Sequence, residues 1–370
     1  MTRLIGLIAL LALMNGCTFS HDTRPDVTPE NVPTVTRGIL DKKDYAVVEV
    51  FFATDRNLTE SMKPGEIFGS SRSTLSYGTC IVSIPRDHRM GELESPSIMR
   101  LELGVDETKH VILRKVIVQH KEKFFADMVA DVGASAKASA FLFVHGYNVT
   151  FEEAARRTAQ IAYDLGFDGA PVFYSWPSQG TTLAYTVDER NIEWAEKNLK
   201  GFLKEFFERS NAQNVYLIAH SLGNRALTRA VATFLAENPS LRQRLKEVIL
   251  AAPDIDADVF KKDIAPALAA AGRPVTLYAS SADLALAVSK NFHGYPRAGE
   301  SGEGIIIIPG IETIDATAVD TSFMGHSYYA EARSILSDIF YLIRNNQRAD
   351  DRFGLKGVNA KGGRYWVFRK

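Results

Sequence analysis

The chain has 370 residues, of which 46% are apolar and 24% are charged, so it can bury a sizeable core and lies outside the composition range of disordered proteins. Its formal net charge of −1 gives no reason to expect a nucleic-acid partner or a strongly charged substrate. Composition does not distinguish one fold class from another, so the pattern along the chain must do so.

Residues 1–17 have the pattern of a secretory signal. Arg3 precedes an apolar run from Leu4 to Met14, which is too short to span a bilayer and leads to Gly16 and Cys17. A cysteine directly after a small residue resembles the cleavage box of bacterial lipoproteins, in which Cys17 would become the acylated first residue of the mature chain. This implies a bacterial envelope protein held to a membrane by lipid. The alternative is an ordinary signal with an incidental cysteine.

Residues 18–40 read as a flexible tether, because they are polar and carry Pro25, Pro29 and Pro33. Three strands are then predicted at 45–54, 77–85 and 110–120, where Val, Ile, Phe and Tyr are frequent. Cys80 lies in the second of these strands and is expected to be a buried, inert thiol. No Cys/His cluster has metal-ligand spacing, so we expect neither a metal nor another cofactor.

From residue 139 onward, continuous apolar strands alternate with amphipathic helices. The pattern predicts helices over 151–165 and 189–209 and from Leu222, and a last helix over 327–343. Further strands are predicted at "APVFYSW", "NVYLIAH", "KEVILAAP", "RPVTLYASS" and "GIIIIPG" (304–310). This alternation predicts an α/β fold, with a mostly parallel sheet covered by helices on both faces, over residues 41–345. Residues 346–370 read as a basic, solvated tail.

The stretch Leu217–Gly223, "LIAHSLG", runs from an apolar strand into a helix around Ser221. A sharp turn of this kind requires small residues two positions before and after its centre, and Ala219 and Gly223 meet that requirement. The turn would project the serine hydroxyl above the sheet and leave the amide of Leu222 free to stabilise negative charge. A serine that only caps the following helix is the alternative interpretation.

These residues resemble the nucleophile motif of the α/β-hydrolase superfamily, with alanine in the first small position. The resemblance implies a triad in the chain order serine, acid, histidine. Asp283 follows a strand where the superfamily carries its acid, and His326 precedes the last helix where it carries its base. Asp254, after the preceding strand, is the rival acid, and His293 is the rival base. Asp315 and Asp320 are weaker candidates for the acid.

The superfamily takes a second oxyanion donor from a loop after an earlier strand, and "FLFVHGYN" (141–148) resembles that loop. Gly146 would let the backbone approach the substrate, and the amide of Tyr147 is the expected donor. His145 would then shape the loop and would not act as the base.

Six segments together resemble a bacterial α/β-hydrolase family catalogued as a domain of unknown function: "VFFATDRN", "FVHGYN", "FYSWPS", "IAHSLGNRAL", "LAAPDID" and "YASSADLAL". The resemblance implies a serine hydrolase, and we expect it to act on a carboxylic ester with a lipid-like or short acyl group. An acyltransferase or amidase would use the same triad. A protein of another class, a non-catalytic envelope lipoprotein that uses the fold for binding or assembly, is the alternative. The segments 86–110 and 288–304 are candidates to border the pocket.

Overall fold

A computed structural model of the protein describes residues 39–41, 44–96, 104–282, 286, 289, 294–319 and 332–369. The predicted signal, Cys17 and all but the end of the predicted tether lie outside the described residues. All the described residues belong to one compact unit, Val35–Lys370. None of the helices in this part of the chain is long and apolar enough to cross a bilayer.

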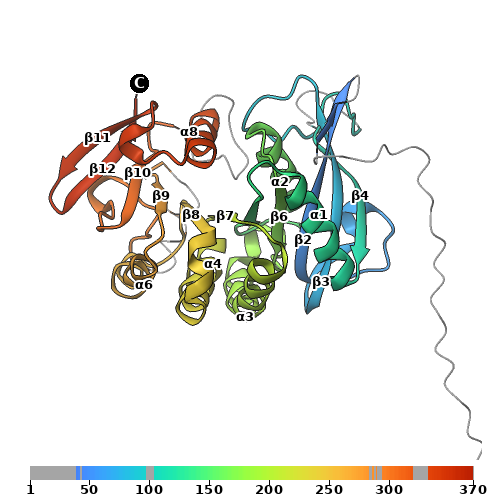
Figure 1. Cartoon of the computed structure of the whole chain (residues 1–370), viewed down its shortest axis with the longest axis horizontal. Helices are drawn as coiled ribbons and strands as arrows, with labels where there is room; N and C mark the ends of the chain where they lie inside the picture. Colours follow the sequence, from blue (N-terminus) through green and yellow to red (C-terminus); the bar gives the residue numbers. More distant parts are fainter. Residues whose placement is uncertain are drawn as a thin grey trace, which may run out of the picture. The chain divides into compact units, whose positions relative to one another are not determined.

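The described strands form one sheet of twelve strands (Figure 1). They are β1 (Ile39–Asp41), β2 (Tyr45–Leu58), β3 (Phe68–Pro85), β4 (Ile112–Gln119), β5 (Ser139–Val144), β6 (Ala170–Ser175), β7 (Asn214–His220), β8 (Leu245–Ala251), β9 (Val275–Ala279), β10 (Ile311–Asp315), β11 (Leu355–Ala360) and β12 (Gly363–Phe368). Their order across the sheet is β11-β12-β10-β9-β8-β7-β5-β6-β2-β3-β4, and β1 pairs with β2. All neighbours from β12 to β2 are parallel, and only the pairs at the two ends are antiparallel. The predicted α/β fold with a mostly parallel sheet is confirmed.

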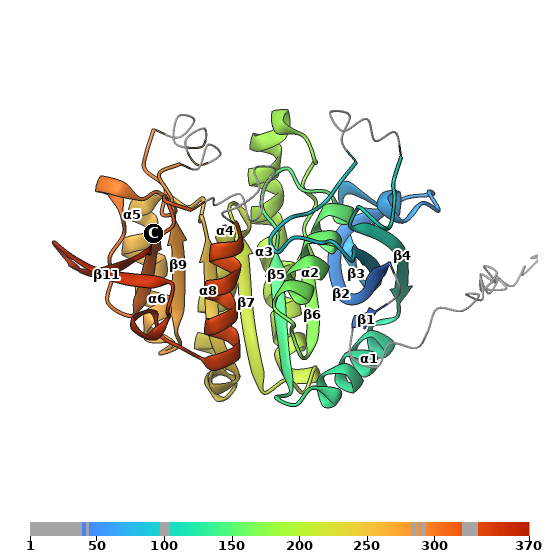
Figure 2. The same ribbon diagram turned by 90° about the horizontal axis from the view of Figure 1, so that it is seen from above.

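Helices cover both faces of the sheet (Figure 2). The α-helices are α1 (Lys121–Ala134), α2 (Phe151–Asp164), α3 (Tyr185–Arg209), α4 (Gly223–Glu237), α5 (Ala257–Val259), α6 (Ala265–Ala270) and α8 (Ala332–Asn345). A π-helical turn, Phe260–Ile264, joins α5 to α6. The 3-10 turns are Pro64–Glu66, Thr182–Ala184, Pro239–Arg244, Gly302–Gly304 and Ala349–Asp351. Helices α2 and α8 pack on one face, and α1, α3, α4 and α6 pack on the other.

The central strands are mostly apolar because both of their faces are covered. In β5 every residue is buried. Phe141 and Phe143 contribute to the apolar cluster under α2 and α8, whereas Leu142 and Val144 contribute to the cluster on the opposite face. Alternate residues of one strand therefore serve two cores, which explains the unbroken apolar run in the sequence.

The predicted strand at 304–310 is wrong. Residues 305–308 are not part of a strand, and the strand of this region, β10, begins only at Ile311. Ile306 is nevertheless buried, and its carbonyl oxygen accepts a hydrogen bond from Thr313 Oγ1 at 2.6 Å. Gly310, with a φ of 87°, turns the chain between the two segments. The loop that carries the isoleucines is partly buried against β10, which explains why its residues are apolar. An apolar run in the sequence fits such a buried loop as well as it fits a strand.

The predicted solvated tail at 346–370 is also wrong, because β11 and β12 extend the sheet beyond β10. Trp366 and Phe368 are buried. Arg352 is fully buried and donates to Asp338 Oδ2 of α8 at 2.9 Å and to Glu312 Oε2 of β10 at 3.1 Å. The basic residues that suggested a solvated tail include Arg352, which holds this segment against α8 and β10. The folded domain therefore continues to the end of the described chain.

Candidate active site

Ser221 lies in the turn between β7 and α4, in a strained backbone conformation. Its φ is 48°, in the left-handed region. This conformation costs a residue with a side chain about 1–2 kcal/mol. Several hydrogen bonds hold it: the Ser221 amide donates to the Ala251 carbonyl at 3.0 Å, and Asn224 Nδ2 donates to the carbonyls of Ser221 at 2.9 Å and Ala251 at 3.1 Å. Among the described residues, no group accepts a hydrogen bond from the Ser221 hydroxyl.

Gly223 is required because α4 begins directly against the end of β5. A Cβ atom at this position would lie 2.3 Å from the His145 carbonyl oxygen and 2.8 Å from that of Val144. On the other side of the serine, Ala219 is buried between its partners in β5 and β8, Val144 and Leu250. The spacing of small residues in "AHSLG" therefore has the steric cause that the sequence suggested.

The loop after β5 packs against the serine. A Cβ atom on Gly146 would lie 3.0 Å from Ser221 Cβ and 2.9 Å from His220 Nδ1. In the described part of the chain, the backbone amides of Tyr147 and Leu222 have no hydrogen-bond acceptor. Leu222 immediately precedes α4, so its amide also lies at the positive end of the helix dipole. Two unused donors thus flank the serine, as an oxyanion hole requires.

His145 holds this loop in place. Its Nδ1 is 2.8 Å from the Gly146 carbonyl, and its Nε2 is 3.2 Å from Ser175 Oγ. The ring stacks on Trp176 with centroids 5.0 Å apart, and Trp176 Nε1 donates to the His145 carbonyl at 2.8 Å. Burial, followed by the nearby charge of Arg56, lowers the pKa of His145 well below its usual value. The imidazole is therefore neutral and serves the shape of the loop.

Arg56 supports the loops near Ser221, and this role was not predicted from the sequence. Its buried guanidinium donates to Ser175 Oγ at 2.8 Å and to the carbonyls of Ser178 at 2.9 Å and Val149 at 2.7 Å. It thereby joins the end of β2 to the loops after β5 and β6. Burial lowers the pKa of Arg56 to about 10, so it remains charged at neutral pH. The signal that could have found it is the charged pair Asp55-Arg56 inside the apolar segment "VFFATDRN".

Asp188 of α3 also supports the loops after β5 and β6. Its buried carboxylate accepts hydrogen bonds from Ser178 Oγ at 2.6 Å, the Gln179 amide at 2.8 Å and the Asn148 amide at 3.2 Å. Asn148 has a φ of 57°, so the residue after the expected oxyanion donor is also left-handed. The position of the Tyr147 amide therefore depends on buried charges from two distant segments.

Asp283 and His326 lie outside the described residues, as do the rivals His293 and Asp320. The strands before them are described. The register pairs His220 with Ala251, Ala251 with Tyr278, and Ala279 with Asp315, so β7, β8, β9 and β10 end at one edge of the sheet. Ser221 lies at that same edge.

Asp254 lies near this edge, but other groups already surround its carboxylate. Oδ2 accepts a hydrogen bond from Tyr185 at 2.6 Å, and Oδ1 accepts one from Ser289 at 2.6 Å. Arg297 Nε and Arg225 Nη2 are 3.2 and 3.5 Å from Oδ1. A carboxylate has about four acceptor positions, so little capacity is left for a histidine. The weaker candidate Asp315 accepts a hydrogen bond from the Thr317 amide at 2.9 Å.

His220, the residue before the serine, is neutral. Burial, together with the charge of Arg157, lowers its pKa to about 3. It therefore supplies no cation beside Ser221 at neutral pH. Cys80 is buried, and burial raises the pKa of its thiol well above the usual range, which confirms the expected inert cysteine. The described residues contain no cluster of His, Cys, Asp and Glu that could hold a metal ion.

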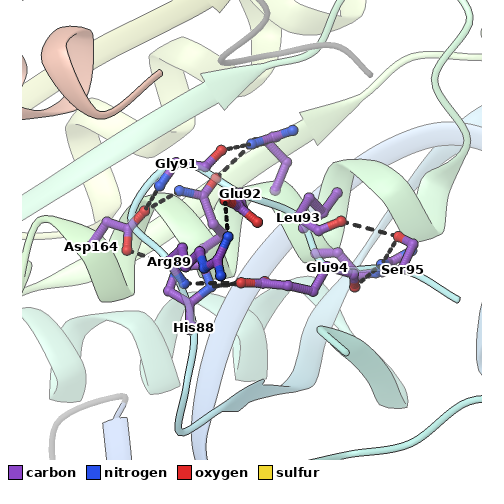
Figure 3. Close-up of polar contacts among 11 residues, drawn as sticks. His88, Arg89, Gly91, Glu92, Leu93, Glu94, Ser95 and Asp164 are labelled. Atoms are coloured by element: carbon purple, nitrogen blue, oxygen red, sulfur yellow. Dashed lines mark hydrogen bonds and ion pairs between the residues drawn. The ribbon is translucent and has the colours of Figure 1, made fainter. Parts of the chain in front are cut away.

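The first part of the 86–110 segment lies along α2 (Figure 3). The buried ring of His88 lies between two carboxylates, with Nδ1 2.8 Å from Glu94 Oε2 and Nε2 2.9 Å from Asp164 Oδ1. Asp164 also accepts from the Gly91 amide at 2.7 Å, and Arg157 donates to the Gly91 carbonyl at 3.2 Å. Part of the other candidate border segment, 288–304, is buried rather than open, because Arg297 and its neighbours pack against the loop after β8.

Comparison with known proteins identifies a family to which the chain belongs. The profile of a family described as "alpha/beta hydrolase of unknown function" (DUF900) matches residues 120–345. No curated protein matches the chain.

Three solved structures are among those to which the chain is similar. A protein from Thermoplasma acidophilum described as a "predicted CIB-like hydrolase" is 16% identical, with 57% of this chain and 88% of that one covered and a TM-score of 0.32. A poly(3-hydroxybutyrate) depolymerase from Bordetella parapertussis is 11% identical, with coverages of 83% and 91% and a TM-score of 0.34. An esterase from Rhizomucor miehei is 11% identical, with coverages of 82% and 85% and a TM-score of 0.34.

Proposed function

Because the chain belongs to a family of α/β hydrolases of unknown function, we propose that it is a serine hydrolase that cleaves a carboxylic ester through an acyl-enzyme intermediate. One observation carries the proposal. Ser221 has a left-handed backbone at a strand-to-helix turn, and the unused amides of Leu222 and Tyr147 flank it. A helix cap alone needs neither the strain nor the second loop.

In the proposed mechanism, His326 removes the proton from Ser221 Oγ as the oxygen attacks the ester carbonyl. Asp283 orients the imidazole and stabilises its cationic form. The carbonyl oxygen becomes an oxyanion, which accepts hydrogen bonds from the amides of Leu222 and Tyr147. His326 then protonates the leaving alcohol as the C–O bond breaks. Water, deprotonated by His326, attacks the acyl-enzyme and releases the carboxylic acid and Ser221.

A fluorophosphonate probe tests the proposal without knowledge of the substrate. The unsubstituted protein should be labelled at Ser221, and Ser221→Ala should lose the label and nearly all ester hydrolysis. The free energy of unfolding should change by only about 1 kcal/mol, because the turn accepts alanine. The matched control is Ser240→Ala, which alters an exposed serine far from the turn. A folded Ser221→Ala protein that still reacts with the probe would refute the proposal.

The substrate class is tested with a panel of esters, thioesters and amides of graded acyl length, because all of these reactions use the same groups. The protein used should lack residues 1–17. We expect the highest kcat/KM for esters. A higher kcat/KM for thioesters or amides would refute the proposed ester substrate, but it would be consistent with Ser221 as the nucleophile.

We also propose that the protein is a lipoprotein of the bacterial envelope, anchored to a membrane through an acylated Cys17. The motif at residues 3–17 supports this proposal.

A further inference from the structure

The carboxylate of Asp254 links two loops that the proposed mechanism needs. The inference drawn here rests on the proposed function, because it concerns the oxyanion hole of Ser221. It starts from the buried position of Asp254, which is only 2% exposed, three residues beyond the end of β8.

On one side, the backbone of Asp254 contacts the nucleophile turn, by which we mean the residues around Ser221 between β7 and α4. Its amide donates to the Ser221 carbonyl at 3.2 Å. Arg225, in the first turn of α4, donates through Nε to the Asp254 carbonyl at 2.6 Å. The turn that carries the Leu222 amide is therefore bonded to the main chain of Asp254.

On the other side, the side chain of Asp254 contacts Tyr185, which packs on the oxyanion loop. This loop is the segment between β5 and α2 that carries the Tyr147 amide. The Tyr185 hydroxyl donates to Oδ2 at 2.6 Å. The ring of Tyr185 packs edge-to-face on that of Tyr147, with centroids 5.2 Å apart, and the Tyr147 hydroxyl donates to the Thr182 carbonyl. Burial and the adjacent Asp254 charge raise the pKa of Tyr185, so its hydroxyl stays protonated and remains a donor.

The remaining contacts hold the carboxylate of Asp254 in one orientation. Ser289 donates to Oδ1 at 2.6 Å and accepts from Arg297 Nε at 2.9 Å. Arg297 is itself 3% exposed and lies 3.2 Å from Oδ1. A buried carboxylate with two guanidinium partners has little freedom to move, so it connects the two loops rigidly.

We propose that Asp254 is a positioning residue that couples the nucleophile turn to the oxyanion loop and so sets the relative placement of the amides of Leu222 and Tyr147. These amides bind the oxyanion and hardly touch the ground-state ester. Loss of the coupling should therefore lower kcat and leave KM almost unchanged.

The test uses Tyr185→Phe, Asp254→Asn and the double variant, with Tyr365→Phe in β12 and Asp258→Asn at an exposed position as matched controls. Turnover of p-nitrophenyl acetate is divided by the number of sites titrated with fluorophosphonate, so that misfolded protein does not contribute. We expect kcat per site to fall about tenfold to a hundredfold in both single variants, with KM within about twofold. The double variant should be no worse than Asp254→Asn, because both changes break one coupling.

Tyr185→Phe keeps the ring on Tyr147 and removes only the hydroxyl, so it tests the proposal even if Asp254→Asn fails to fold. A kcat per site equal to that of the controls in Tyr185→Phe overturns the proposal. A shift in the acid limb of the pH profile of kcat in Asp254→Asn also overturns it, because Asp254 would then act on the base. If the unsubstituted protein takes up no label at Ser221, the proposed function fails as well. Normal labelling with unaffected variants refutes the coupling alone.

Discussion

Gly223 approaches His145 so closely that a Cβ atom on the glycine would stand 2.3 Å from the histidine carbonyl oxygen. The turn around Ser221 and the loop after β5 are thus in backbone contact. Gly223→Ala should lower the free energy of unfolding by about 2 kcal/mol or more, because a main-chain oxygen cannot move aside as a side chain can. Gly201→Ala is the control, since nothing lies within 4 Å of that position in the exposed middle of α3. This change should raise stability by about 0.5–1 kcal/mol. Equal effects in urea unfolding would contradict the steric account.

Asp283 and Asp254 should differ in the size of their effect on catalysis. Asp283→Asn should reduce kcat by about 10³–10⁴, because the histidine loses the group that fixes its tautomer. Asp254→Asn should cost far less, since its carboxylate is occupied by Tyr185, Ser289 and two arginines. His326→Ala should match Ser221→Ala, and the two losses should not add. A larger loss in Asp254→Asn than in Asp283→Asn would transfer the role of the acid to Asp254.

The His88 cluster should make stability depend on pH in the alkaline range. Burial alone lowers the pKa of His88, but hydrogen bonds and charges from Asp164 and Glu94 outweigh it and raise the pKa from 6.5 to about 9. A group with a raised folded pKa contributes fully below its unfolded pKa, near pH 6.5, and loses its contribution as the pH rises through about 9. The loss should be of the order of 3 kcal/mol.

This dependence is checked by the free energy of unfolding between pH 6.5 and 9.5 in the unsubstituted protein and in His88→Gln. The variant should lack the decline. His120→Gln, at the exposed N-cap of α1, is the control and should keep it. Parallel curves for all three proteins would show that His88 is not the titrating group.

The C-terminal strands should depend on a buried ion pair. Arg352→Met should lower the free energy of unfolding by about 3–5 kcal/mol, because it leaves the buried carboxylate of Asp338 without its cation. Burial raises the pKa of Asp338 to about 6, and Arg352 opposes that rise. Arg364→Met is the control in the same segment: its pair with Asp350 is half exposed and should contribute less than about 1 kcal/mol. A solvated tail would make the two variants alike.

Cys17 should carry the lipid anchor. Metabolic labelling with a palmitate analogue should mark the protein, and Cys17→Ser should abolish the label and release the protein from membranes. Anchoring should be firm in the unsubstituted protein, because a mature lipoprotein carries several acyl chains and a single chain binds only marginally. Cys80→Ser is the control and should keep the label, since that thiol is buried. Undiminished labelling of Cys17→Ser would refute the anchor.

The sequence by itself determined the α/β fold and the strand-to-helix turn around Ser221, because both depend on local patterns. A strand covered on both faces is apolar along most of its length, as β5 is from Ala140 to Val144. A strand-to-helix turn needs small residues beside its centre, as at Ala219 and Gly223. Asp283 and His326 were assigned by their order along the chain, and they stay predictions.

Only the tertiary structure decided which charged residues are buried and what they support. Arg56 binds Ser175, which is 119 positions away, and Asp254 binds Tyr185, 69 positions away. Neither pairing leaves a periodic signal, because the partners meet only when the sheet brings the ends of distant strands together. The same holds for the end of the chain. From the sequence, the arginines of 346–370 predicted a solvated tail, because their acidic partners are far away along the chain. In the structure, Asp338 and Glu312 pair with the buried Arg352, and this segment forms the last strands of the sheet.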